Sequence, residues 1–296
     1  LTVNKPLYHS VMEELSKNND YISELRSYYT RTFNAHNFSF IIDINNVLTQ
    51  KDTVILKEEK HRLQDVISQL QTIAPQKTDL GLYQGQCGAM LALALYADFF
   101  NDNSADHIAT NIFNNILHSI SSDIPITFNN GLCGIGWALA FLVSQSVIAY
   151  NDISVELTTI DSLIMERYLP RVTDISLSNG TGGVIAYIIS RIAINPRNAP
   201  LPFCNEYLKE VYHAALSLYN SEETNWRTLT FAIAFIKCYE HNIWNLSVPQ
   251  IEDFYELPTF LPKETCYQKV GIQGLSGFAL FLIERQHRAK SFRNFN

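Results

Sequence analysis

A glycine motif, G-x-x-G, recurs ahead of strongly apolar segments and constrains this chain more than any other feature. Four copies read YQGQCGAMLALALYADFF, NNGLCGIGWALAFLVS, SNGTGGVIAYIISRIA and IQGLSGFALFLIE. Their leading glycines are Gly85, Gly131, Gly180 and Gly274, separated by 46, 49 and 94 residues, and 94 is twice 47. The period predicts a fifth copy near residue 227, where NWRTLTFAIAFIKCYE lacks both glycines but keeps the apolar pattern. The chain is therefore expected to be built from repeats of about 47 residues.

Between the motifs lie amphipathic segments, such as EEKHRLQDVISQLQTIA, DHIATNIFNNILHSI and NEYLKEVYHAALSLY. Each has one apolar stripe and one polar face, which is typical of an outer helix, whereas the segments after G-x-x-G are apolar nearly all round and indicate buried inner helices. The pattern predicts an all-α fold, an α/α toroid of six helical hairpins. We expect a single domain over residues 1–296, with the repeats over 56–290 and one N-terminal hairpin within 1–55. A phosphate-binding role for the glycines is disfavoured, because a helix and not a strand is predicted before Gly180.

The composition limits which binding partners we expect for this protein and in which cell compartment we expect to find it. The formal net charge is −7 and no basic cluster is present, which argues against nucleic acid or an anionic membrane as a partner. The apolar runs are too short to span a bilayer. Five scattered cysteines indicate reduced thiols and a cytoplasmic location. Two of them, Cys87 and Cys133, occupy the third position of G-x-x-G, where packing is favoured over metal binding.

The repeats, above all FNNGLCGIGWALAFL and GIQGLSGFALFLIE, resemble the lanthionine synthetase C-like proteins, which are α/α toroids. The resemblance covers about residues 56–290. It implies the family's chemistry, in which a zinc ion activates a peptide cysteine thiol for addition to a dehydroamino acid. The family's ligands resemble W-C-Y-G in one repeat and C-H-G in a later one, and an A-H-G histidine assists proton transfer.

Carried over residue by residue, the resemblance places the A-H-G histidine at Asn179 and the W-C-Y-G cysteine at Asn225. If GIQG is the C-H-G unit, its cysteine falls on Ile272 and its histidine on Gln273; if GIQG is the terminal repeat, the C-H-G unit is absent. Zinc needs thiolate, imidazole or carboxylate ligands, and an amide cannot exchange protons near neutral pH. We therefore predict no zinc or other cofactor and no cyclase activity.

The residue before each leading motif position is an amide or an indole, and the resemblance implies that these side chains face a central cavity. Such groups suit a peptide or another small polar ligand, although amides here can also act as helix N-caps. We further expect Trp226 and Asn179 to share a pocket. The candidate ligand-binding residues are Gln84, Asn130, Asn179, Asn225, Trp226 and Gln273.

Two functions stay open at this point. One is a zinc-less accessory protein or divergent enzyme that binds a precursor peptide, with or without a peptide-modifying partner enzyme, in ribosomal peptide maturation. The alternative is a carbohydrate-active enzyme on a six-hairpin toroid, which needs two carboxylates at the cavity mouth. The carboxylates considered for that role are Asp79, Asp123, Asp174 and Glu264.

Overall fold

The computed structural model describes residues 57–167, 169, 172–255 and 269–293. The chain divides into two compact units, Leu1–Glu59 and Lys60–Asn296. The described residues belong to the second unit, except for residues 57–59, which begin the first described helix. The hairpin predicted within residues 1–55 lies outside the described residues and stays a prediction.

The described part of the chain is helical, as the sequence predicts, and contains no β-strand. The outer helices are residues 57–73, α5 (Asn103–Ser119), α7 (Ser154–Met165) and α9 (Asn205–Asn220). The inner helices are α4 (Gln86–Phe100), α6 (Leu132–Ser144), α8 (Thr181–Ala193), α10 (Trp226–His241) and α11 (Leu275–Arg293). Short 3-10 helices in the described connections include η1 (Ala74–Gln76), η2 (Tyr150–Asp152) and η4 (Ile251–Asp253). The copy without glycines, predicted near residue 227, is confirmed as α10.

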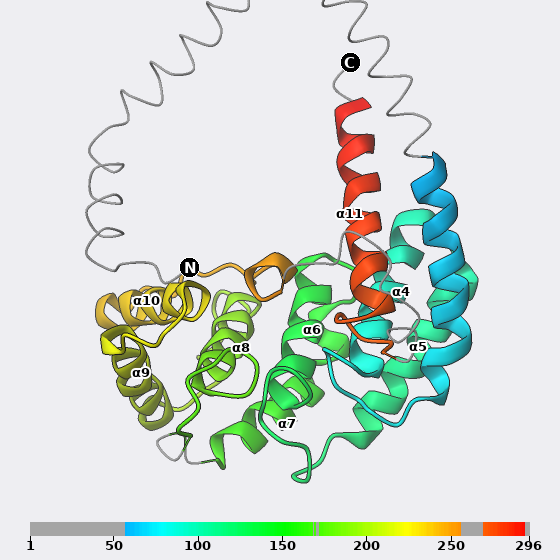
Figure 1. The fold of residues 1–296 in the computed structure, drawn as a ribbon. Helices are drawn as coiled ribbons and strands as arrows, with labels where there is room; N and C mark the ends of the chain where they lie inside the picture. Colours follow the sequence, from blue (N-terminus) through cyan, green and yellow to red (C-terminus); the bar gives the residue numbers. More distant parts are fainter. Residues whose placement is uncertain (1–56, 168, 170–171, 256–268, 294–296) are drawn as a thin grey trace, which may run out of the picture. The chain divides into compact units, whose positions relative to one another are not determined.

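Burial separates the two kinds of helix. Every residue of α6 from Leu132 to Leu142 is buried, whereas α5 buries only one stripe, made of Ala105, Ala109, Ile112 and Ile116. The inner helices contact one another in the order α11, α4, α6, α8, α10, so the last motif helix packs beside the first (Figure 1). This is the inner and outer helix arrangement of an α/α toroid of helical hairpins. No helix among the described residues is both long and apolar enough to cross a membrane.

The leading glycine of each motif lets a loop carbonyl approach the start of the inner helix. A Cβ atom on Gly180 would lie 2.0 Å from the carbonyl oxygen of Asp174, and that oxygen accepts a hydrogen bond of 2.9 Å from the N–H of Thr181. The loop thus satisfies an N–H that a helix start otherwise leaves without a partner. At Gly131 the approaching carbonyl belongs to Pro125, because a Cβ atom on Gly131 would lie 2.0 Å from the carbonyl oxygen of Pro125. The expected close approach is confirmed, but positive φ angles are not found at the described glycines.

Candidate functional site

The loops before four inner helices lie edge to edge and form what we call the loop row. Its segments are residues 79–84 before α4, 125–130 before α6, 174–179 before α8 and 269–273 before α11. Gln273 N donates to Tyr83 O at 2.9 Å, Tyr83 N donates to Asn129 O at 2.8 Å, and Asn129 N donates to Ser178 O at 2.9 Å. Backbone hydrogen bonds therefore connect repeats that are distant in sequence, and they fix the side chains that the loops carry.

The six candidate ligand-binding side chains lie on the loop row and at the start of α10. Across the row, Gln84 Nε2 donates to Gln273 Oε1 at 3.4 Å, so two amides from the first and last motifs meet. The Oδ1 atom of Asn130 is buried and has no hydrogen-bond partner among the described residues. Four of the six side chains are exposed, namely Gln84, Asn179, Asn225 and Trp226, while Asn130 and Gln273 are partly buried.

Capping does not explain the amides of the loop row. The N-cap residues of α4, α6 and α8 are the motif glycines, and no side chain caps these helices. Asn225 differs, because its Oδ1 accepts a hydrogen bond of 2.9 Å from Thr228 N and caps α10, the inner helix that lacks the glycine. The capping interpretation thus holds for Asn225 and is wrong for Gln84, Asn130 and Asn179.

The residues matched to the zinc ligands do not fit a zinc site. Asn225 is engaged as a helix cap, and Ile272 is 1% exposed within the core and offers no lone pair. The Gln273 oxygen accepts from Gln84. Within the described ranges, no three His, Cys, Asp or Glu side chains lie close enough together to hold a metal ion. No step of zinc chemistry can be assigned to these positions.

The motif cysteines are packing residues. Cys87 and Cys133 are fully buried, and burial raises the pKa of the Cys87 thiol to about 12. Burial also raises the pKa of Cys133, and the nearby Asp161 carboxylate adds to that effect. Both thiols stay protonated near neutral pH, whereas the thiolate is the form that binds metal.

A pocket of about 230 Å³ lies between α8, α10 and residues 245–253. Trp226 lines it, together with Arg227 of α10 and Asp253 of η4. The guanidinium carbon of Arg227 lies 4.8 Å from the centre of the Trp226 ring, and the indole is 53% exposed. Asn179 is not among the lining residues, so the predicted sharing of one pocket with Trp226 is not found.

The charge of Arg227 also acts on the loop row. Burial raises the pKa of Tyr83, while a hydrogen bond with Ser178 and the Arg227 charge lower it. Tyr83 directly precedes Gln84, and its ring centre lies 5.7 Å from that of Tyr255.

Two of the four carboxylates considered for glycoside hydrolysis shape turns. Asp79 Oδ1 accepts from Gly81 N at 2.8 Å, and Asp174 Oδ1 accepts from Ser176 N at 2.7 Å. Asp123 is exposed, and Glu264 lies outside the described residues. No pair of these carboxylates is brought together in a pocket in the described part of the chain.

Comparison with known proteins agrees with the repeat pattern. Residues 76–232 match the family model described as lanthionine synthetase C-like protein. The chain belongs to this family. The match covers the motif copies that begin α4, α6 and α8 and reaches the start of α10. No curated protein matches the chain.

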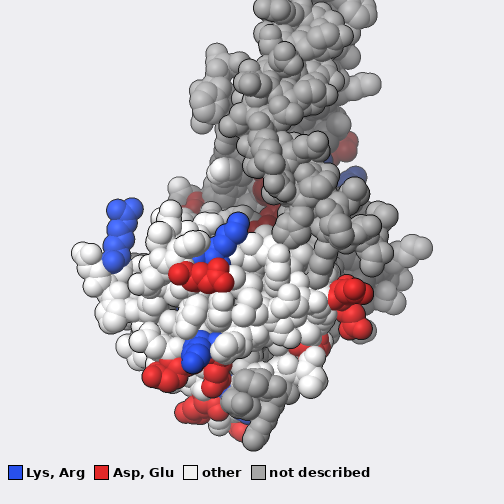
Figure 2. Space-filling view, turned by 90° about the vertical axis from the view of Figure 1, so that its left-hand side faces the viewer, with Lys and Arg blue, Asp and Glu red and all other residues white. Residues whose placement is uncertain are grey.

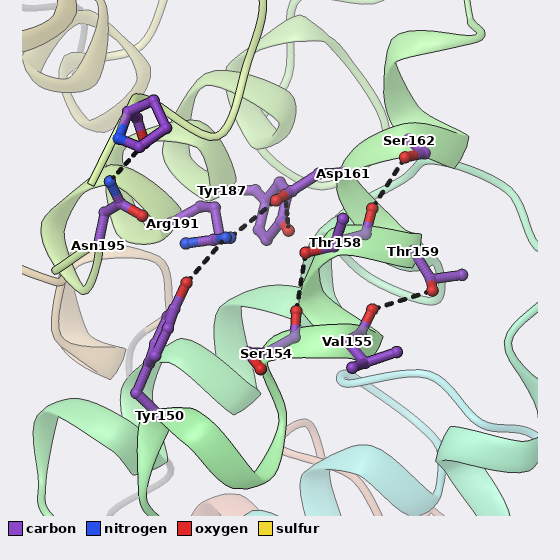
Figure 3. Close-up of polar contacts among 11 residues, drawn as sticks. Tyr150, Ser154, Val155, Thr158, Thr159, Asp161, Ser162, Tyr187, Arg191 and Asn195 are labelled. Carbon is purple, nitrogen blue, oxygen red and sulfur yellow. Dashed lines mark hydrogen bonds and ion pairs between the residues drawn. The ribbon is translucent and has the colours of Figure 1, made fainter.

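Sequence reasoning missed a buried polar cluster between α7 and α8 (Figure 3). Tyr187 OH donates to Asp161 Oδ1 at 2.6 Å, Arg191 Nε donates to Asp161 Oδ2 at 2.8 Å, and Arg191 Nη2 donates to Tyr150 OH at 3.3 Å. Two signals were available in the sequence. Asp161 lies on the apolar stripe of α7 beside Ile160, and Arg191 interrupts an inner helix that is otherwise almost free of charge. The cluster joins an outer helix to an inner helix, away from the loop row.

Proposed function

We propose that this protein is a zinc-less member of the lanthionine synthetase C-like family that binds a peptide during ribosomal peptide maturation without closing thioether rings itself. The main support for the proposal comes from two residues matched to the family's zinc ligands: Asn225 caps α10, and Ile272 is buried in the core. A chain that kept the family's chemistry would need lone pairs and exchangeable protons there.

Peptide binding is supported by polar and aromatic side chains on the loop row and at the start of α10. Gln84 and Asn179 are exposed amides on two loops of the loop row, with the loop over residues 125–130 between them, and each can donate to and accept from a peptide backbone. Trp226, at the start of α10, adds an exposed indole face, which suits an apolar side chain. On the face in Figure 2, Lys and Arg side chains lie apart from one another, and some lie beside Asp or Glu side chains, so this face offers little to a polyanion. Buried thiols at Cys87 and Cys133 support a cytoplasmic location.

Two measurements on the untagged full chain test the proposal. Elemental mass spectrometry of protein purified without chelator is expected to find far less than one zinc per chain. One zinc per chain, lost in Cys266→Ala, would contradict it. In the second measurement, the protein is mixed with a pool of synthetic twelve-residue peptides and the bound fraction is recovered by gel filtration. We expect retained peptides, and fewer of them with Trp226→Ala.

A further inference from the structure

Another pocket, of about 610 Å³, lies between α5, the start of α4 and the segment over residues 75–80, and we call it the α5 pocket. Three of its polar lining residues, Asn111, Asn115 and Ser119, are spaced four residues apart along α5. Residues with this spacing lie on one face of an α-helix, about 6 Å apart along its axis. One face of this outer helix therefore presents a ladder of polar side chains to the pocket.

The middle side chain of the ladder is fixed by a buried glutamine. Asn115 Nδ2 donates to Gln86 Oε1 at 2.7 Å, and Gln86 is only 2% exposed. Gln86 Nε2 in turn donates to the carbonyl oxygens of Ala74 at 3.2 Å and Lys77 at 2.8 Å. Because the nitrogen and the oxygen of the Gln86 amide are both engaged, this residue positions Asn115 and is not itself available to a ligand. The Asn115 side chain is therefore held in place before a ligand binds.

The ladder keeps hydrogen-bonding groups for a ligand. Asn111 Nδ2 lies 3.2 Å from His107 Nε2, and the oxygens of the Asn111 and Asn115 side chains take part in no hydrogen bond among the described residues. Ser119 Oγ donates to the Asn115 carbonyl oxygen at 2.7 Å, so the lone pairs of this hydroxyl are left to accept. Each side chain of the ladder thus offers an acceptor, and each asparagine amide has a second N–H to donate. A peptide group, with one N–H and one C=O, is the matching partner.

The spacing of the ladder also fits an extended peptide. In an extended chain each residue advances by about 3.3–3.4 Å, and every second residue turns its N–H and C=O toward the same side. Peptide groups that face one way therefore recur at about 6.7 Å, against about 6 Å between neighbouring side chains of the ladder. Across the whole ladder the two spacings differ by about 1.4 Å, which is small enough for side-chain rotation to accommodate.

The remaining lining favours a peptide main chain over a charged ligand or a sugar. Among the described residues that line the α5 pocket, Lys77 is the only charged one, and no aromatic ring is present to stack on a sugar. The volume of about 610 Å³ falls within the roughly 300–1,000 Å³ of ligand pockets. A short uncharged segment of peptide therefore suits both the size and the polarity of the pocket.

We propose that the α5 pocket binds a short extended segment of the peptide through its main chain, with alternate peptide groups paired to Asn111, Asn115 and Ser119. Recognition of this kind depends little on which side chains the peptide carries. Leu80, which belongs to the first segment of the loop row, also lines the pocket, so the two places adjoin. The proposal rests on the peptide-binding function proposed above and specifies which part of the peptide is recognised.

The test uses two forms of the twelve-residue peptide pool on the full chain. One form has ordinary peptide bonds, and the other is N-methylated at each of its six central residues, which removes main-chain N–H donors and leaves the side chains unchanged. We expect gel filtration to recover about threefold less of the methylated pool, because each lost hydrogen bond weakens binding. This ratio is measured on the unaltered protein.

Asn111→Ala places the contact in the α5 pocket. We expect it to lower the recovery of the ordinary pool about threefold and to bring the ratio of ordinary to methylated pool closer to one. The matched control is Asn114→Ala, since Asn114 is an exposed asparagine of the same helix that does not line the pocket. It should change neither quantity, and circular dichroism should show both variants folded like the wild type.

Two results would overturn the α5 site while peptide binding stands. One is ordinary recovery in Asn111→Ala together with reduced recovery in Trp226→Ala. The other is an equal loss of both pools in Asn111→Ala, which would show that the contact is not with the main chain. If neither pool is retained by the wild type, the peptide-binding function is overturned as well.

Discussion

Asp161 Oδ2 lies 2.8 Å from Arg191 Nε, and the two residues are only 1% and 3% exposed. Burial raises the pKa of Asp161 to about 6, against the opposing effects of the Arg191 charge and the Tyr187 hydrogen bond. For the Asp161 carboxylate, the free-energy cost of burial exceeds the stabilisation that it gains from Arg191 and Tyr187. The pair therefore specifies how α7 packs on α8, and it is not a net source of stability.

The first prediction concerns the pH dependence of that pair. The pKa of Asp161 in the folded protein, about 6, is above the unfolded value of about 3.8. Its contribution to stability is therefore fully present below pH 4 and is lost as the pH rises through 6. Asp161→Asn mimics the protonated form and removes this dependence. The free energy of unfolding of the wild type, minus that of the variant, should fall by about 2 kcal/mol between pH 4 and pH 7 in urea titrations.

Asp65→Asn is the matched control, because Asp65 is exposed on the outer helix over residues 57–73. Its difference from the wild type should stay within about 0.5 kcal/mol across the same pH range. A difference for Asp161→Asn that is flat with pH, or that rises from pH 4 to pH 7, would show that the carboxyl is not held in this way.

The second prediction uses a glycine outside the paired G-x-x-G positions. A Cβ atom on Gly136 of α6 would lie 2.3 Å from the Tyr187 ring, whose hydroxyl is hydrogen-bonded to Asp161. Gly136→Ala gains about 1 kcal/mol of helix propensity, but it forces the buried ring away from Asp161. We expect a net loss of about 1–2 kcal/mol in urea unfolding. Ser144→Ala, at an exposed position at the end of α6, should stay near the wild type, and a gain of stability in Gly136→Ala would refute the ring contact.

The sequence was sufficient to predict the repeat and the alternation of inner and outer helices, because both follow from local patterns. The period predicted the leading position of this copy near residue 227, two residues from Asn225, which is the N-cap of α10, without any glycine to mark it. The apolar stripe of α5 and the wholly apolar α6 distinguished an outer from an inner helix in the same way.

The site could be predicted only in part, since its geometry depends on contacts between repeats. Gln84 and Gln273 are 189 residues apart, and their hydrogen bond follows from ring neighbours that the period alone does not specify. The role of Asn225 as a cap, in contrast to Asn179, depends on which loop carbonyl reaches the helix start. The pocket beside Trp226 is completed by residues 245–253, a segment without repeat character.

The third prediction concerns the leading glycine of the α8 motif. A side chain at Gly180 would displace the Asp174 carbonyl, which accepts from Thr181 N, and would leave that N–H without its partner. Gly180→Val should therefore destabilise the protein by about 1–3 kcal/mol. Thermal unfolding measured by circular dichroism checks it. A melting temperature unchanged within about one degree would show that the loop is free to move away.

The fourth prediction contrasts two asparagines at neighbouring positions of the repeat. Asn225 Oδ1 accepts from Thr228 N and replaces the loop carbonyl that caps the other inner helices. Asn179 precedes Gly180, the N-cap of α8, and its side chain caps nothing. Asn225→Ala should therefore cost about 1 kcal/mol of unfolding free energy, whereas Asn179→Ala should cost less than about 0.5 kcal/mol. Both side chains are exposed and belong to the proposed peptide-binding residues, so the effect of each substitution on peptide binding is measured separately. If Asn179→Ala lowers the amount of twelve-residue peptide retained in gel filtration at unchanged stability, the amide serves binding. Equal destabilisation by the two substitutions would contradict the difference in capping.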